Sequence, residues 1–237
     1  MMYQIFSFIL SALIISIIVK KFKFKVYDLK IANHKSSAII SVMVVLVIAN
    51  IMFPLTIIFM KGFVVNGVTN VIINVLLEIT PVIIITLLRK ESLYSLGITK
   101  KNILKSVLIG FISYIIYFAF MVIMKQYRFP FTPHSVISLW SFLNIFVLAF
   151  AEEVLFRGYL QTRLTEWLGD QRGWILTAFL FSFSHLFLRI LSVNMSFSRT
   201  LVSCIAIFPG ALFLGYLFSK CKNVVAPTVF HTFYNFL

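Results

Sequence analysis

The stretch ISLWSFLNIFVLAFAEEVLFRGYL, residues 137–160, is a nearly continuous apolar run that contains two adjacent glutamates, Glu152 and Glu153, and one arginine, Arg157. It is long enough for an α-helix to cross a bilayer, which takes about 20 apolar residues. A charged side chain at the centre of a membrane helix costs about 2.5 to 3.5 kcal/mol on insertion scales. The stretch therefore predicts a membrane helix whose charges are kept for a reason, and that reason is usually function.

The whole chain has the composition of a protein embedded in lipid. Its 237 residues are 61% hydrophobic and 12% charged, and the mean hydropathy is +1.02. These values exclude an ordinary water-soluble domain. Long apolar runs recur along the chain, whereas a β-barrel has short segments of alternating hydrophobicity. We therefore expect an all-α polytopic membrane protein.

Eight apolar segments are candidate transmembrane helices, and we expect them to form one membrane domain over residues 1–237, a bundle that encloses a polar intramembrane site. They cover residues 3–19, 38–60, 71–88, 104–124, 137–160, 174–188, 201–218 and 224–237. The first segment is followed by a lysine cluster and has no basic residue before it, which is the reverse of a cleavable signal peptide, so we interpret it as a retained helix. The sixth and eighth segments are short for crossing, as befits helices that line a cavity inside a bundle.

The net charge of +14 carries topology information and does not indicate a nucleic-acid partner. The connections after the first, third, fifth and seventh spans hold fifteen basic residues: Lys20, Lys21, Lys23, Lys25, Lys30, Lys35, Arg89, Lys90, Lys100, Lys101, Lys105, Arg163, Arg172, Lys220 and Lys222. The alternate connections hold five: Lys61, Lys125, Arg128, Arg189 and Arg199. Because cytoplasmic loops are enriched in Lys and Arg, we expect the first set in the cytoplasm and both termini outside.

Glu152, His185 and His231 belong to three different spans and have similar predicted depths. Counting about 1.5 Å per residue from the cytoplasmic helix ends places them roughly 12, 16 and 10 Å deep, respectively. The three helices would therefore bring one carboxylate and two imidazoles to one level, nearer the cytoplasmic face. Glu78 in the third span lies about 15 Å deep, and two alternatives are open for it: a partner of this site or a structural role.

Helix spacing gives the two neighbouring glutamates different partners. Glu153 and Arg157 are at positions i and i+4 in the favourable order, so we expect them to form an ion pair. The Glu152 side chain points about 100° away from that of Glu153 and has no local partner. We therefore expect Glu152 to be the general base that deprotonates a water. By the same spacing, Asn235 shares a face with His231 and can donate to an oxyanion.

These residue types supply the minimum set for peptide hydrolysis: a carboxylate base, imidazoles that orient the water or bind a metal, and donors for a tetrahedral intermediate. The chain contains no His-Glu-x-x-His sequence, no Gly-x-Ser-x-Gly elbow and no phosphate-binding loop, so other hydrolytic and ATP-driven mechanisms lose support. A buried ion pair that only fixes helix packing is an alternative for Glu153 and Arg157, but it leaves Glu152 without a partner. Each histidine, taken alone, also fits a hydrogen-bonded role in the core.

Three ordered motifs resemble those of the CPBP intramembrane proteases, the CAAX-processing and bacteriocin-processing enzymes that are also called the Abi group. They are Glu152-Glu153-x-x-x-Arg157, Phe181-x-x-x-His185 and His231-x-x-x-Asn235. Each motif is weak alone, whereas three in this order on three spans are specific. The resemblance places a motif-bearing catalytic core at residues 138–237.

The resemblance implies an eight-helix fold and an endopeptidase that cleaves a peptide bond near the cytoplasmic side of the membrane. It implies these roles: water activation by Glu152 with His185, oxyanion stabilisation by His231 and Asn235, and support of Glu153 by Arg157. The family is called a metalloprotease group. Zinc is therefore a candidate cofactor, with Glu152, His185 and His231 as candidate ligands and an open fourth position.

The small, lysine-rich and isoleucine-rich chain is typical of a bacterial protein, in which prenylated CAAX substrates are not expected. We therefore expect a multi-pass cell-membrane enzyme that processes a bacteriocin or signalling-peptide leader, or that gives self-immunity to such a peptide. Its expected partners are a peptide or membrane-associated protein substrate and the lipid bilayer, with no nucleic acid. Two alternatives are open: a non-catalytic membrane immunity or scaffold protein, and a proton-coupled transporter that uses Glu78 and the glutamate pair as a relay.

Overall fold

A computed structural model of the chain describes residues 2–22, 29, 35–47, 51, 67–124, 138–193 and 195–236. These residues are helical with short connections and contain no strand, which confirms the all-α prediction. The elements are α1 (Met2–Phe22), α2 (Lys35–Val47), α4 (Gly67–Leu88), η2 (Leu93–Leu96), α5 (Ile103–Ile123), α6 (Leu139–Glu153), η3 (Val154–Gln161), α7 (Thr162–Leu168), α8 (Asp170–Val193), α9 (Phe197–Cys221) and α10 (Val225–Phe236). Most of the second half of the predicted span 38–60 lies outside the described residues.

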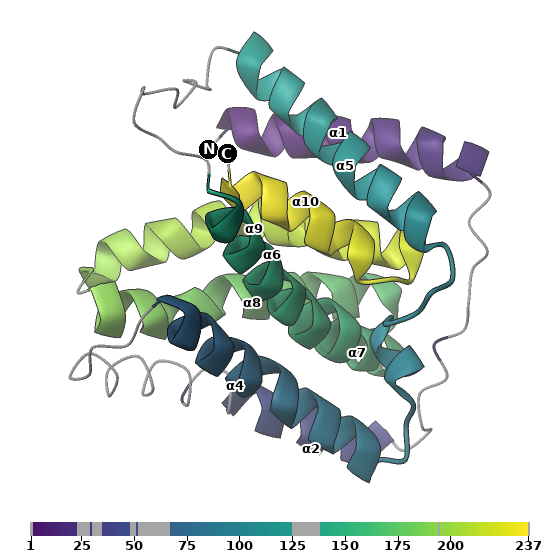
Figure 1. The fold of residues 1–237 in the computed structure, drawn as a ribbon, viewed down its shortest axis with the longest axis vertical. Coiled ribbons are helices and arrows are strands. Elements are labelled where there is room, and N and C mark those ends of the chain that lie inside the picture. Colours follow the sequence, from purple (N-terminus) through teal and green to yellow (C-terminus); the bar gives the residue numbers. More distant parts are fainter. Residues whose placement is uncertain are drawn as a thin grey trace.

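The helices lie side by side in a layered bundle (Figure 1). Helices α1 and α5 form one side, α2 and α4 form the opposite side, and α6, α9 and α10 lie between them. The short helix α10 packs against α5, α6 and α9, while α8 packs along α9. The helices that carry the three motifs are therefore next to one another in the middle of the bundle.

Among the described residues, five helical segments are long and apolar enough to cross a membrane: Met2–Lys21, Val71–Leu88, Ile103–Ile123, Leu139–Leu168 and Phe197–Cys221. Large apolar side chains such as those of Leu13, Leu104 and Val202 are more than half exposed on them, as expected for faces that contact lipid. The remaining predicted spans also contain helices, but α8, α10 and the described part of α2 are not among these five. The chain is a multi-pass membrane protein.

Several basic residues expected in connections belong to helices, among them Arg189 and Arg163. The sixth span, predicted at residues 174–188, is a helix of 24 residues, Asp170–Val193. Arg189 ends the apolar run in the sequence, but the helix continues past it because a charge on one face does not break the backbone hydrogen bonds. Arg163, counted among the loop charges, lies in α7 and is buried.

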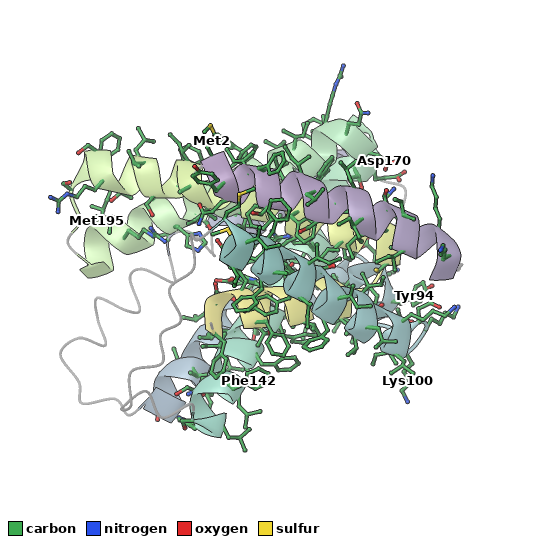
Figure 2. All side chains as sticks on the ribbon, turned by 90° about the horizontal axis from the view of Figure 1, so that it is seen from above. Met2, Tyr94, Lys100, Phe142, Asp170 and Met195 are labelled. Carbon is green, nitrogen blue, oxygen red and sulfur yellow. The ribbon has the colours of Figure 1, made fainter. Side chains whose placement is uncertain are left out.

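The connections after α4 and α9 meet at one end of the bundle. The Asn223 side chain donates through Nδ2 to the carbonyl oxygens of Thr99, at 3.0 Å, and Lys101, at 3.1 Å. Tyr94, Lys100 and Asp170 lie toward this end in Figure 2, and Met195 lies toward the other. The described connections after α4 and α9 and the start of α8 therefore lie toward one side of the molecule.

An aromatic cluster holds α10 in place within the bundle. Phe230 of α10 packs edge-on against Phe213 of α9 with ring centroids 4.9 Å apart, and against Tyr117 of α5 at 5.9 Å. Phe8 of α1 stacks on Tyr117 at 4.8 Å. Because Phe230 directly precedes His231, this packing fixes the position of the histidine.

Candidate active site

The two adjacent glutamates lie at a change of helix type. The α-helix α6 ends at Glu153 and the π-helical segment η3 continues from Val154. Wider π-helical turns are rare, and they occur frequently at functional sites. The Glu153 side chain is fully buried, whereas the Glu152 side chain is 27% exposed, so the two carboxylates are in different surroundings.

Glu153 is bound from two directions. Arg157 donates through Nη1 to Oε1 of Glu153 at 3.0 Å, the ion pair that the i,i+4 spacing predicts. His231 Nδ1 lies 2.8 Å from the same oxygen, a contact that the sequence did not predict. Arg157 also donates through Nη2 to the carbonyl oxygen of Ala211 at 3.2 Å. Glu153 and Arg157 therefore join η3 to both α9 and α10.

His231 lies between the two glutamates. Its Nδ1 faces the Glu153 carboxylate and must carry a hydrogen, because a carboxylate oxygen can only accept. Its Nε2 lies 3.6 Å from Oε2 of Glu152. The orientation of the ring is thus fixed on one side by Glu153, and its other nitrogen is presented to Glu152.

The ring of His185 is also held through its Nδ1 atom, in this case by a backbone group of its own helix. Its Nδ1 lies 2.9 Å from the carbonyl oxygen of Phe181, one turn earlier in α8. A carbonyl oxygen can only accept, so Nδ1 donates and Nε2 is left with its lone pair. A cavity of about 340 Å³ is lined by Glu152, His185, His231 and Asn235. The four residues predicted to be catalytic therefore share one cavity.

The aromatic ring of Phe181 lies at the centre of these contacts. The guanidinium carbon of Arg157 lies 4.2 Å from its centroid. The rings of His185 and His231 contact it at centroid distances of 5.1 and 5.9 Å. Phe181 is 3% exposed, so this buried ring packs against both histidines and against Arg157. The sequence indicated only that Phe181 shares a face with His185.

Helix α9 approaches η3 and α8 closely at Gly215. Gln161 donates through Nε2 to the Gly215 carbonyl oxygen at 2.9 Å, and Trp174 donates through Nε1 to that of Leu212 at 2.8 Å. A Cβ atom at Gly215 would lie 2.5 Å from Trp174 Cδ1. A side chain at this position would push α9 away from the helices that carry the first two motifs.

A second buried ion pair anchors the far end of η3. Arg163 pairs with Glu91 and donates through Nη2 to Ser95 Oγ at 2.9 Å. Its Nη1 donates to the carbonyl oxygen of Gly158 at 3.1 Å and to Thr162 Oγ1 at 2.7 Å. Arg163 was counted among the basic residues of a connection, and the sequence does not show that this part of the chain folds against the connection that carries Glu91.

Asn223 sets the start of α10. Its Oδ1 accepts a hydrogen bond from the backbone N–H of Val225 at 2.9 Å, while its amide holds the connection after α4. This bond caps the helix that carries His231 and Asn235. Asn223 was noticed in the sequence only as part of the family resemblance, and its position just before the helix is the signal that could have identified it.

Glu78 of α4 is buried and lies close enough to Glu152 to interact with it electrostatically. Its Oε2 atom has no hydrogen-bond partner among the described residues. Glu78 does not belong to the cavity lining. It is therefore a neighbour of Glu152 that does not face the cavity.

Glu152, His185 and His231, the three candidate zinc ligands, line one cavity. In the described part of the chain, no three His, Cys, Asp or Glu side chains are gathered so that they could hold a metal ion. The Nδ1 atoms of both histidines are occupied, that of His231 by Glu153 and that of His185 by the Phe181 carbonyl. Nε2 is therefore the atom that each histidine would offer to a metal, and zinc stays a prediction of the family resemblance.

The C-terminal part of the chain matches a known protein family. Residues 134–237 match the family model described as Rce1-like, type II CAAX prenyl endopeptidase. This match confirms the resemblance to the CPBP family that the three motifs indicated. No curated protein and no solved structure matches the chain.

Proposed function

We propose that this chain, whose residues 134–237 match the Rce1-like type II CAAX prenyl endopeptidase family, is an intramembrane endopeptidase with Glu152 as its general base. The family implies CAAX-type protease activity. The observation that supports the mechanism best is the arrangement around His231. One glutamate holds its Nδ1, and the other lies in the cavity 3.6 Å from its Nε2.

The first step is the activation of water. Glu152 takes one proton from a water molecule in the cavity. The lone pair on His185 Nε2 accepts a hydrogen bond from the other O–H of this water and so orients its oxygen. The water oxygen then bonds to the carbonyl carbon of the peptide, and the carbonyl π electrons move onto its oxygen. A positioned general base of this kind contributes about 10²- to 10⁴-fold to the rate.

The second step is the stabilisation and collapse of the tetrahedral intermediate. The proton on Glu152 can pass to the nearby Nε2 of His231, and Glu153 then stabilises the imidazolium from the other side, as a carboxylate does in a catalytic triad. His231 and the Asn235 amide donate to the oxyanion. When the C–N bond breaks, the leaving amine takes the proton from His231.

We further propose the full topology of eight spans, with the basic end of the bundle and the cleaved bond toward the cytoplasm. The fifteen-to-five distribution of basic residues supports this orientation. In cells, an impermeant thiol reagent should label a cysteine introduced as Ser196→Cys and not one introduced as Lys100→Cys. The reverse labelling would contradict the orientation.

The biological role that we propose is the processing of a bacteriocin or signalling peptide, or immunity to such a peptide. Comparative peptidomics of cells that carry the wild type or Glu152→Ala tests catalysis and identifies the substrate together. Glu166→Ala, at an exposed position in α7, is the matched control. Peptides that depend on Glu152 and not on Glu166 support the proposal. An identical peptidome with an intact immunity phenotype in Glu152→Ala and His185→Ala would instead indicate a non-catalytic immunity protein.

A further inference from the structure

Arg189 lines the same cavity as the candidate catalytic residues. It lies four residues after His185 in α8, so the two side chains share one face of the helix. Glu152 is the other fully charged side chain among the described lining residues. The cavity therefore holds one acidic group, from α6, and one basic group, from α8.

The guanidinium of Arg189 has no ion-pair or hydrogen-bond partner within the part of the chain that the structure describes. The buried arginines of the bundle differ from it in this respect. Arg157 is paired with Glu153, and Arg163 is paired with Glu91. An arginine within a membrane helix is costly unless it has a partner or faces water. Its position on the cavity wall indicates that the partner enters with the substrate.

The spacing along α8 indicates where such a partner would lie. Four helical residues separate Arg189 from His185 by about 6 Å along the axis. An extended peptide advances about 3.3 Å per residue, so this distance corresponds to about two residues from the cleaved bond. Helix α9 contributes small residues, Ala206 and Gly210, to the wall of the same cavity. This wall leaves room for a substrate chain.

We propose that Arg189 is a specificity-determining residue that binds a carboxylate of the substrate about one to three residues from the cleaved bond. A guanidinium matches a carboxylate with two parallel hydrogen bonds. The carboxylate has two possible sources, the C-terminal carboxylate of the peptide or an Asp or Glu side chain. This inference rests on the proposed endopeptidase function.

The test uses the full-length protein in liposomes and a chymotryptic peptide library, prepared with free or amidated C-termini. Mass spectrometry identifies the cleaved peptides, and the KM and kcat of the best of them are then measured. We expect cleaved peptides to be enriched in a carboxylate one to three residues from the cut. Loss of this enrichment on amidation identifies the C-terminal carboxylate, and its persistence identifies a side chain.

Arg189→Gln should raise KM for these peptides about 10- to 100-fold, the value of one charge-assisted contact, with a smaller change in kcat. Arg189→Lys should recover part of the loss, and Arg199→Gln, an exposed position in α9, is the control. Cleavage that depends on Glu152 but shows no carboxylate preference, or an unchanged KM in Arg189→Gln, would overturn the inference alone. A library left intact by the wild type, or cut equally by Glu152→Gln, would overturn the proposed function and this inference with it.

Discussion

Replacing Arg157 with methionine should leave the Glu153 carboxylate charged and buried without its cation. Both side chains are fully buried, and their hydrogen bond is 3.0 Å long. Removing one partner from a buried ion pair costs about 3 to 5 kcal/mol. The same change removes the hydrogen bond from Arg157 to the Ala211 carbonyl and the contact of its guanidinium with Phe181. We therefore expect a free energy of unfolding at least about 3 kcal/mol below the wild-type value.

The second variant needed is Glu153→Gln together with Arg157→Met. This double change removes both charges, and the glutamine side-chain oxygen can still accept the hydrogen bond from His231. Replacing a buried ion pair by neutral residues of similar volume is often close to neutral. The double variant should therefore be about 2 kcal/mol or more stable than Arg157→Met alone, which is the coupling that a double-mutant cycle measures.

The assay is reversible unfolding in mixed micelles by titration with sodium dodecyl sulfate, followed by circular dichroism. Arg172→Met, at an exposed position in α8, is the matched control and should stay within about 0.5 kcal/mol of the wild type. If Arg157→Met is no less stable than this control, or if the double variant is no more stable than the single one, the interpretation of the pair is refuted.

Three further substitutions separate chemistry from packing. His185→Gln should abolish cleavage in liposomes with little loss of stability, because its described hydrogen bonds are local to α8; a large loss of stability would assign the ring to packing. Asn235→Ala should lower kcat about 100- to 1,000-fold, the usual cost of one oxyanion donor, and a kcat equal to that of the wild type would contradict this role. Glu78→Gln should keep most of the kcat, because Glu78 does not line the cavity; loss of cleavage at normal stability would instead place Glu78 in proton transfer.

The sequence predicted the helical membrane fold because lipid imposes a strong rule on composition. Backbone groups within the bilayer must be satisfied inside the segment, so long apolar runs indicate helices whatever their tertiary contacts. The pair of Glu153 and Arg157 was also predictable, because helical spacing alone places the two side chains on one face. Both inferences depend on local geometry, which a sequence contains directly.

Contacts between distant segments were the part that could not be predicted. The hydrogen bond between His231 and Glu153 depends on how α10 is rotated against α6, and the packing of aromatic rings decides that rotation. The pairing of Arg163 with Glu91 depends on two connections folding together. In sequence, both residues look like ordinary charges near a membrane surface.

Arg189 shows why the end of an apolar run is a weak guide to the end of a helix. A charged residue lowers the local hydropathy, which ended the predicted span at residue 188. The helix nevertheless continues to Val193, with Arg189 on the cavity wall, because a charged side chain does not interrupt the backbone hydrogen bonds. A charge just beyond an apolar run, one turn after a histidine, is the signal that could have indicated this.

The central claim is that Glu152 is the base of an intramembrane endopeptidase. The most direct measurement compares peptide cleavage by the wild type, Glu152→Gln and Glu166→Gln, each purified and reconstituted in liposomes at equal folded amounts. We expect Glu152→Gln to lose about 100-fold or more of kcat, and Glu166→Gln, at an exposed position in α7, to keep the wild-type rate. Full activity in Glu152→Gln would show that Glu152 is not the base.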